Sequence, residues 1–128
     1  MCGYIGKFSK KPIDYKHMDV CNELQICRGP DEKKLVTDTV SNIFDSKNNN
    51  YFSFVFNRLR ILDFSEYSSQ PMFSKEFNSS IMFNGEIYNH SELRTYLEQQ
   101  GINFYSDHSD TEVLLNGFSY LGINFVDK

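Results

Sequence analysis

Short apolar runs and helical segments follow one another along this chain in no regular order. Four runs have the length and composition of β-strands: residues 2–8, Leu35–Thr37, Phe52–Phe56 and Ile81–Phe83. Three longer segments are typical of helices: residues 15–26, 89–100 and 109–121. Because strands and helices do not alternate strictly, the pattern favours α+β layers over a doubly wound parallel sheet.

Two of the predicted helices have recognisable ends. In Asn89–Glu92 the asparagine is predicted to cap the helix, and the glutamate is predicted to reach back to it. Ser109–Glu112 repeats this capping box at the start of the next helix. Gly101 and Gly122 are typical of residues that stop a helix. The two C-terminal helices are therefore bounded at both ends by the sequence.

The first helix is predicted from its apolar positions alone. These positions form roughly one stripe: Met18, Val20, Cys21, Leu24 and Ile26. Arg28–Asp31 ends the helix, and Asn48–Asn50 is predicted to be a turn. The segment Asp63–Ser79 shows no period and is predicted to be a loop. Cys21 is expected to be a small buried hydrophobic residue of the first helix.

Charge and length exclude several classes of protein. The chain of 128 residues suits one domain, and its net charge of −4 disfavours a nucleic-acid partner. No apolar run approaches the roughly 18 residues of a membrane span, and the N-terminus lacks the features of a signal peptide. The three cysteines form no CxxC pair, so reduced thiols in a cytoplasmic protein are expected.

Cys2 is the candidate nucleophile. A small residue after Met1 allows the initiator methionine to be removed, which leaves cysteine as the first residue. Its own α-amine can then act as the general base toward its thiol, so such a nucleophile needs no histidine partner. A cysteine at position 2 is weak support when taken alone, since an incidental cysteine there is by far the more common explanation.

Other residues could complete such a site. Asn84 and Gly85 supply a side-chain amide and an unhindered backbone N–H that suit an oxyanion hole, although Asn-Gly is also the commonest hairpin turn. Arg58 suits the binding of a carboxylate, although a solvent-facing arginine at a strand end is the more common case when the residue is taken alone. Asp110 is either a binding carboxylate or an ordinary acid at a helix start, and Glu86 is either a site residue or an exposed turn acid.

These residues belong to motifs that occur in a definite order. The motifs are Met1–Gly3, Arg28–Asp31, Asn57–Asp63, Gln70–Met72, Asn84–His90 and Ser109–Glu112. In this order the chain resembles the class II, N-terminal-nucleophile glutamine amidotransferase domain, in particular the glutaminase domain of glutamine-hydrolysing asparagine synthetase. The resemblance covers almost the entire chain. It implies an αββα sandwich of the N-terminal-nucleophile hydrolase type, with its C-terminal part missing.

The resemblance also implies roles for individual residues. Cys2 would attack the glutamine carboxamide to form a thioester, while Asn84 and Gly85 would hold the oxyanion. Arg58 would bind the substrate α-carboxylate and Asp110 its α-ammonium. The remaining implied residues are Glu86 near the substrate and the backbone of Leu59, Ile61 and Leu62 along the glutamine pocket. Arg28–Asp31 would be a structural loop beside the site.

The chain departs from the family pattern in three places. Cys27 stands where the family usually has histidine, and it is expected to be a buried, inert thiol. The family domain runs on for roughly sixty to seventy residues past the position of Phe125, so a truncated domain over residues 1–128 is expected. The ATP-binding synthetase domain is absent, so ATP and magnesium are implied only for that missing part.

The expected activity is hydrolysis of glutamine to glutamate and ammonia for an acceptor such as aspartyl-AMP. The expected partners are glutamine and a synthetase domain in cis or in trans, with a homodimer possible; no metal or organic cofactor is predicted for this chain. Two alternatives stay open. The chain could be an inactive domain that binds glutamine or another protein, or the glutaminase of a sugar, purine or polysaccharide pathway.

Overall fold

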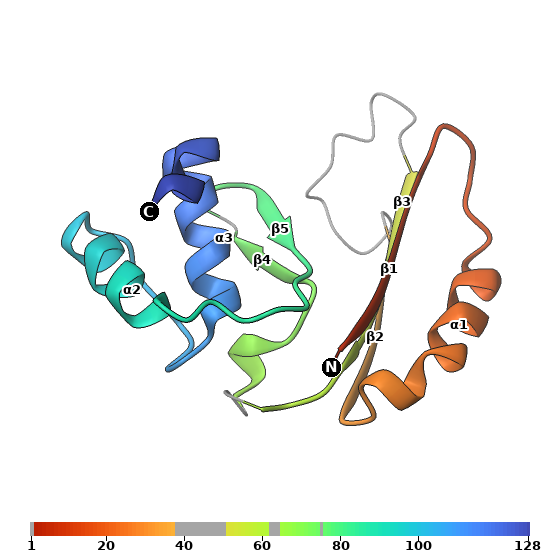
Figure 1. The fold of residues 1–128 in the computed structure, drawn as a ribbon. Coiled ribbons are helices and arrows are strands. Elements are labelled where there is room, and N and C mark those ends of the chain that lie inside the picture. Colours follow the sequence, from red (N-terminus) through yellow and green to blue (C-terminus); the bar gives the residue numbers. More distant parts are fainter. Residues whose placement is uncertain (1, 38–50, 62–64, 75) are drawn as a thin grey trace. The chain divides into compact units, whose positions relative to one another are not determined.

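The computed structural model describes residues 2–37, 51–61, 65–74 and 76–128 and contains both helices and sheets (Figure 1). This mixture confirms the α+β prediction. The chain divides into two compact units, Met1–Arg60 and Ile61–Lys128. Within the described residues, no helix has the length and apolar character needed to cross a bilayer. Each unit is described by itself below.

The first unit is a three-stranded antiparallel sheet with one helix. Its elements are β1 (Gly3–Ser9), α1 (Tyr15–Leu24), the 3-10 helix η1 (Ile26–Arg28), β2 (Glu32–Thr37) and β3 (Tyr51–Arg58). β3 is the central strand, since the order in the sheet is β1-β3-β2. The strands predicted at residues 2–8, 35–37 and 52–56 are confirmed, with longer bounds for the last two. The turn predicted at Asn48–Asn50 lies outside the described residues.

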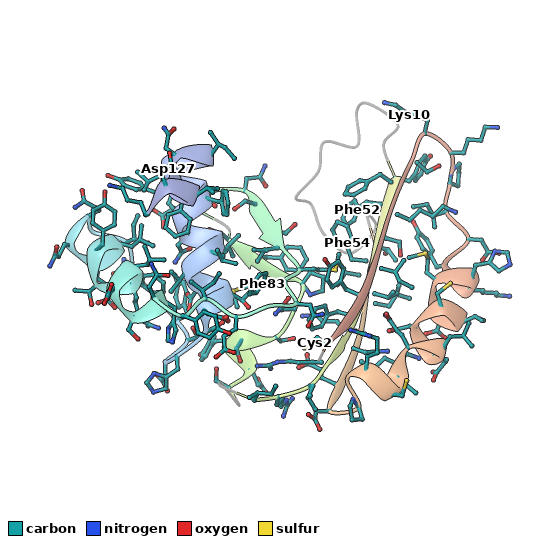
Figure 2. All side chains as sticks on the ribbon, in the orientation of Figure 1. Cys2, Lys10, Phe52, Phe54, Phe83 and Asp127 are labelled. Carbon is teal, nitrogen blue, oxygen red and sulfur yellow. The ribbon has the colours of Figure 1, made fainter. Side chains whose placement is uncertain are left out.

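Alternate residues of β3 serve opposite faces of the sheet, as the period of two in a strand requires. Val55 is fully buried and packs with Ile13 and Met18, so it belongs to the side that α1 covers. Phe52 and Phe54 point away from α1 (Figure 2). Phe54 meets the ring of Phe8 edge to face, with ring centroids 5.4 Å apart. The continuous apolar run of β3 is therefore a strand buried on both faces.

The apolar stripe predicted for the first helix is confirmed only at Met18, which is buried in the core. Val20 and Leu24 are exposed, and the side chains that α1 buries are Met18 and Asn22. Asn22 is fully buried because its side chain donates to Lys34 O and its carbonyl accepts from Asn57 Nδ2 at 2.7 Å. The helix faces the sheet with this polar contact, which a search for apolar periodicity cannot detect.

The second unit combines a short hairpin with two helices. Its elements are η3 (Glu66–Ser68), β4 (Met72–Ser74), β5 (Ser79–Ile81), α2 (His90–Gln99), α3 (Asp110–Leu121) and η4 (Gly122–Asp127). β4 and β5 pair antiparallel. The predicted loop Asp63–Ser79 is therefore wrong over η3 and β4, although residues 62–64 and 75 lie outside the described residues. The strand predicted at Ile81–Phe83 ends instead at Ile81.

The core of this unit lies between α2 and α3. Leu97 and Val113 are fully buried there, together with Leu93, Ile102 and Phe125. Gly117 lets the ring of Phe125 approach α3, because a Cβ at Gly117 would lie 2.3 Å from that ring. The apolar faces of the two helices are thus the source of the stability of this unit.

The two predicted capping boxes differ in outcome. Ser109 caps α3, since its side chain accepts from Glu112 N at 3.3 Å. The Glu112 carboxylate does not reach back to Ser109 and instead accepts from Tyr105 N and Ser106 N, each at 2.8 Å. Asn89 precedes α2 but makes no side-chain cap, so the box predicted there is wrong.

Candidate functional site

The thiol of Cys2 lies against the end of the central strand. Cys2 directly precedes β1, as Figure 2 shows, and Gly3 pairs with Asn57 of β3. This register brings Leu59, one residue beyond β3, beside the thiol. Leu59 N donates to Cys2 Sγ at 3.3 Å, and Sγ lies 3.6 Å from Leu59 O. The main chain of Leu59 thus contacts the sulfur through both its N–H and its carbonyl oxygen, which fixes the position of the thiol.

The loop Arg28–Asp31 holds both partners of this contact. Arg28 Nε donates to Cys2 O at 3.2 Å. Asp31 N donates to Arg58 O at 3.0 Å, and the Asp31 carboxylate accepts from Arg60 N at 2.8 Å. Gly29 packs so closely that a Cβ there would lie 2.2 Å from Asn57 O. The loop therefore fixes the end of β3 and the residue that carries the thiol.

Arg58 is the last residue of β3 and is buried, with 6% of its surface exposed. Its Nη1 lies 3.4 Å from Glu32 Oε2, and Arg60 Nη2 lies 3.5 Å from the same oxygen. One carboxylate thus faces two guanidinium groups. A guanidinium group is suited to bidentate contact with a carboxylate ligand, so Arg58 has the chemistry that its predicted role requires. Sequence reasoning missed Glu32, because no motif marked it.

In the second unit, Asn84, Gly85 and Glu86 form an exposed segment after β5. Asp110, the first residue of α3, is buried at 7% exposure. The structure brings Asp110 to this segment, because Ile87 N donates to Asp110 Oδ2 at 3.1 Å. The predicted oxyanion donors and the predicted ammonium ligand are thus neighbours within one unit.

Two further residues support that segment and were not predicted. Gln70 Oε1 accepts from Phe83 N at 2.6 Å, and Gln70 Nε2 donates to Thr111 Oγ1 at 3.1 Å. Gln70 lies in the Gln70–Met72 motif, so the sequence marked the position but indicated no role. Because Asp63–Ser79 was predicted to be a loop, the contact of Gln70 with Thr111 of α3 could not be predicted.

The other predicted residues are dispersed. Ile61 is exposed at 67%, and Leu62 lies outside the described residues. Cys27 is exposed, so the buried thiol expected there is wrong, and Cys21 is only half-buried. The described residues include no cluster of three or more histidine, cysteine, aspartate or glutamate side chains that could hold a metal ion. The cofactor prediction is untested and stays a prediction.

Comparison with known proteins gives one consistent family. The model of the glutamine amidotransferase domain family matches residues 1–128. Asparagine synthetase [glutamine-hydrolyzing] 1 of Bacillus subtilis is 38% identical over 120 residues, which are 90% of this chain and 17% of the relative. Asparagine synthetase [glutamine-hydrolyzing] 3 of the same organism is 34% identical over 123 residues, 92% of this chain and 18% of the relative. An Arabidopsis thaliana asparagine synthetase is 36% identical over 70 residues, which cover 55% of this chain and 11% of that protein. The chain thus spans less than a fifth of the length of these relatives.

Proposed function

We propose, since this chain belongs to the family of glutamine amidotransferase domains, that it hydrolyses glutamine to glutamate and ammonia as the glutaminase part of an asparagine synthetase-like enzyme. The observation that carries the proposal is the Cys2 thiol, which receives the Leu59 N–H at 3.3 Å. The relatives are named as glutamine-hydrolysing enzymes. A cysteine that becomes N-terminal supplies both the nucleophile and the base for such a reaction.

In the proposed reaction, removal of Met1 frees the α-amine of Cys2 to accept the thiol proton. Sγ then attacks the side-chain carboxamide carbon of glutamine. The tetrahedral intermediate collapses with cleavage of the C–N bond, the ammonium group returns the proton to the leaving nitrogen, and ammonia departs. A γ-glutamyl thioester remains on Sγ. The same amine deprotonates a water molecule, which attacks the thioester, so that the C–S bond breaks and glutamate and the thiol are released.

Charge and hydrogen-bonding capacity support the proposed roles of the other residues. In this proposal Arg58 binds the α-carboxylate and Asp110 the α-ammonium of glutamine, because a zwitterionic substrate requires one cation and one anion. Asn84 Nδ2 and Gly85 N stabilise the oxyanion. The remaining proposed contacts are Glu86 and the backbone of Leu59, Ile61 and Leu62.

The wider setting of the reaction is part of the same proposal. Residues 1–128 belong to a glutaminase domain with the αββα sandwich of N-terminal-nucleophile hydrolases. The ammonia passes to a synthetase domain that uses ATP and magnesium, while this chain needs no cofactor. The relatives named asparagine synthetases support this choice of acceptor over a sugar or purine precursor. The proposed location is the cytoplasm.

Covalent labelling tests the proposal. Intact mass first shows whether Met1 is removed, and 6-diazo-5-oxo-norleucine, a glutamine analogue, is then expected to add to Cys2. Cys2→Ala should abolish both the adduct and glutamate production. Cys27→Ala is the matched control, because it removes an exposed thiol and should preserve both. Equal labelling of Cys2→Ala, or glutamate formation by that variant, would contradict the proposal.

A further inference from the structure

We propose that Gln70 and Thr111 are positioning residues that hold the segment Asn84–Glu86 and the Asp110 carboxylate in one fixed geometry. This inference rests on the proposed function for its catalytic consequence. The two side chains belong to elements that are distant in sequence: Gln70 precedes β4, and Thr111 is in the first turn of α3. Neither has a role in the nucleophile assignment, although both lie in motifs that the sequence contains.

Four hydrogen bonds connect the two ends of the segment. Phe83 N donates to Gln70 Oε1 at 2.6 Å, and Gln70 Nε2 donates to Thr111 Oγ1 at 3.1 Å. Thr111 Oγ1 donates to Asp110 Oδ1 at 3.4 Å, and Asp110 Oδ2 accepts from Ile87 N at 3.1 Å. Phe83 and Ile87 flank Asn84–Glu86, so the network closes around the segment.

The backbone N–H of Phe83 and the carboxylate of Asp110 determine which group donates and which accepts in each hydrogen bond of this network. The backbone N–H of Phe83 can only donate, which requires the carbonyl oxygen of Gln70 to face it and leaves the amide NH2 for Thr111. Thr111 Oγ1 accepts that donor and retains its own proton for Asp110, whose carboxylate can only accept when ionised. An apolar side chain at position 70 removes the hydrogen bonds to Phe83 N and Thr111 Oγ1, and one at position 111 removes those to Gln70 Nε2 and Asp110 Oδ1.

The three side chains of the network are buried, so they can hold the exposed segment in position. Gln70, Thr111 and Asp110 are 6%, 4% and 7% exposed, whereas Asn84, Gly85 and Glu86 are exposed. A buried hydrogen-bonding group loses its partner at a substantial cost, so these three side chains resist reorientation. Figure 2 marks Phe83, the residue whose N–H begins the network. The exposed donors of Asn84 and Gly85 are therefore flanked by Phe83 and Ile87, whose N–H groups are bonded to buried side chains.

The network connects the segment proposed to stabilise the oxyanion with Asp110, which is proposed to bind the α-ammonium group. Oxyanion donors must be oriented before the reaction, because donors that reorient during it contribute less. Misplacement of such groups by about 1 Å can lower a rate roughly 100-fold. Loss of the network should therefore lower kcat through Asn84 and Gly85 and raise the KM for glutamine through Asp110.

Four variants of the 128-residue chain test the inference. Gln70→Leu and Thr111→Val remove the hydrogen bonds with little change of volume, while Thr111→Ser retains the hydroxyl group. Gln99→Leu is the control for the glutamine substitution, because Gln99 is exposed at the end of α2. The measurements are amide hydrogen exchange at Phe83 and Ile87, followed by kcat and KM for glutamine. If Gln70→Leu does not fold, the Thr111→Val and Thr111→Ser pair gives the answer.

The expected result is faster exchange at Phe83 and Ile87 in Gln70→Leu and Thr111→Val, with kcat about 10- to 100-fold lower and a higher KM. Thr111→Ser and Gln99→Leu should resemble the wild type. Unchanged exchange in Gln70→Leu and Thr111→Val, or unchanged kcat and KM in active variants, overturns the inference. Faster exchange together with a wild-type chain that forms no glutamate overturns the proposed function instead and supports the hydrogen-bonded network.

Discussion

The backbone N–H of Leu59 donates a hydrogen bond to Cys2 Sγ at 3.3 Å, across 57 residues of sequence. Leu59 directly follows the central strand β3, whose register with β1 places Gly3 opposite Asn57. The position of the thiol therefore depends on where β3 ends and on the loop Arg28–Asp31 that packs against that end. A change far from Cys2 in sequence can consequently alter its reactivity.

Gly29→Ala should disturb this arrangement. A Cβ at position 29 would lie 2.2 Å from Asn57 O and 2.5 Å from the Arg58 carbonyl carbon, and backbone atoms cannot rotate away. Overpacking of this kind costs about 1–3 kcal/mol of unfolding free energy. We expect a lower thermal midpoint and slower labelling of Cys2 by 6-diazo-5-oxo-norleucine. An unchanged midpoint together with an unchanged labelling rate would show that the loop yields to the extra methyl group.

In Arg58→Lys, the lysine should not perform the role proposed for Arg58. The guanidinium group lies 3.4 Å from Glu32 Oε2 and is planar, which suits bidentate contact with a carboxylate, whereas an ammonium group is a point charge without that planar geometry. We expect the KM for glutamine to rise about tenfold or more, which corresponds to a loss of about 1.4 kcal/mol of binding. Alkylation of Cys2 by iodoacetamide, which carries no carboxylate, should be unchanged. A wild-type KM would exclude Arg58 as the carboxylate ligand.

Leu97→Ala should destabilise the second unit. Leu97 is fully buried between α2 and α3, in contact with the cluster around Val113. Truncation of a buried leucine costs about 2–5 kcal/mol, because transfer energy is lost and a cavity remains. Denaturant unfolding followed by circular dichroism measures this loss. Gln99→Ala on the exposed end of the same helix is the control and should remain within about 0.5 kcal/mol of wild type. Equal midpoints for the two variants would contradict the placement of the core.

Lys33 should make stability depend on alkaline pH. Its hydrogen bond to Glu23 and its contact with Asp19, 2.9 Å away, raise the pKa of Lys33 above the usual 10.5. The folded state therefore holds this proton more tightly, so the stabilisation is complete below pH 10.5 and is lost as the pH rises through the higher folded pKa.

Unfolding of wild type and Lys33→Met across this pH range measures the effect. The difference in stability between them should be small, since the group is exposed, and should disappear at the highest pH and in high salt. Lys7→Met, on an exposed residue of β1, is the control. A difference that grows with pH would contradict the assignment.

Local signals in the sequence determined much of the secondary structure. The apolar run at Phe52–Phe56 predicted β3, and glycine with a positive φ ends both C-terminal helices, as expected for Gly101 and Gly122. Glycine adopts this backbone conformation without the clash of a Cβ, so the signal is local and readable. The cap of α3 at Ser109 was also predicted correctly, because its partner, Glu112 N, lies only three residues away.

Signals failed where the deciding partner was distant. Asn22, which is not part of the predicted apolar stripe, is buried together with Met18 because its partners, Lys34 O and Asn57 Nδ2, come from the sheet. Glu112 fits a capping box in sequence but accepts from Tyr105 N and Ser106 N, seven and six residues earlier and therefore outside the capping motif. The exposure of Cys27 likewise could not be predicted from the residues next to it in sequence.

For the candidate site, the sequence by itself determined the residue types: a thiol at Cys2, amide donors at Asn84 and Gly85, a cation at Arg58 and an anion at Asp110. The order of the motifs determined the family. Only the tertiary structure decided that Leu59 N faces Cys2 Sγ and that Gln70 joins Phe83 N to Thr111. Hydrogen bonds between residues distant in sequence depend on strand register and helix packing, which no local pattern of residues specifies.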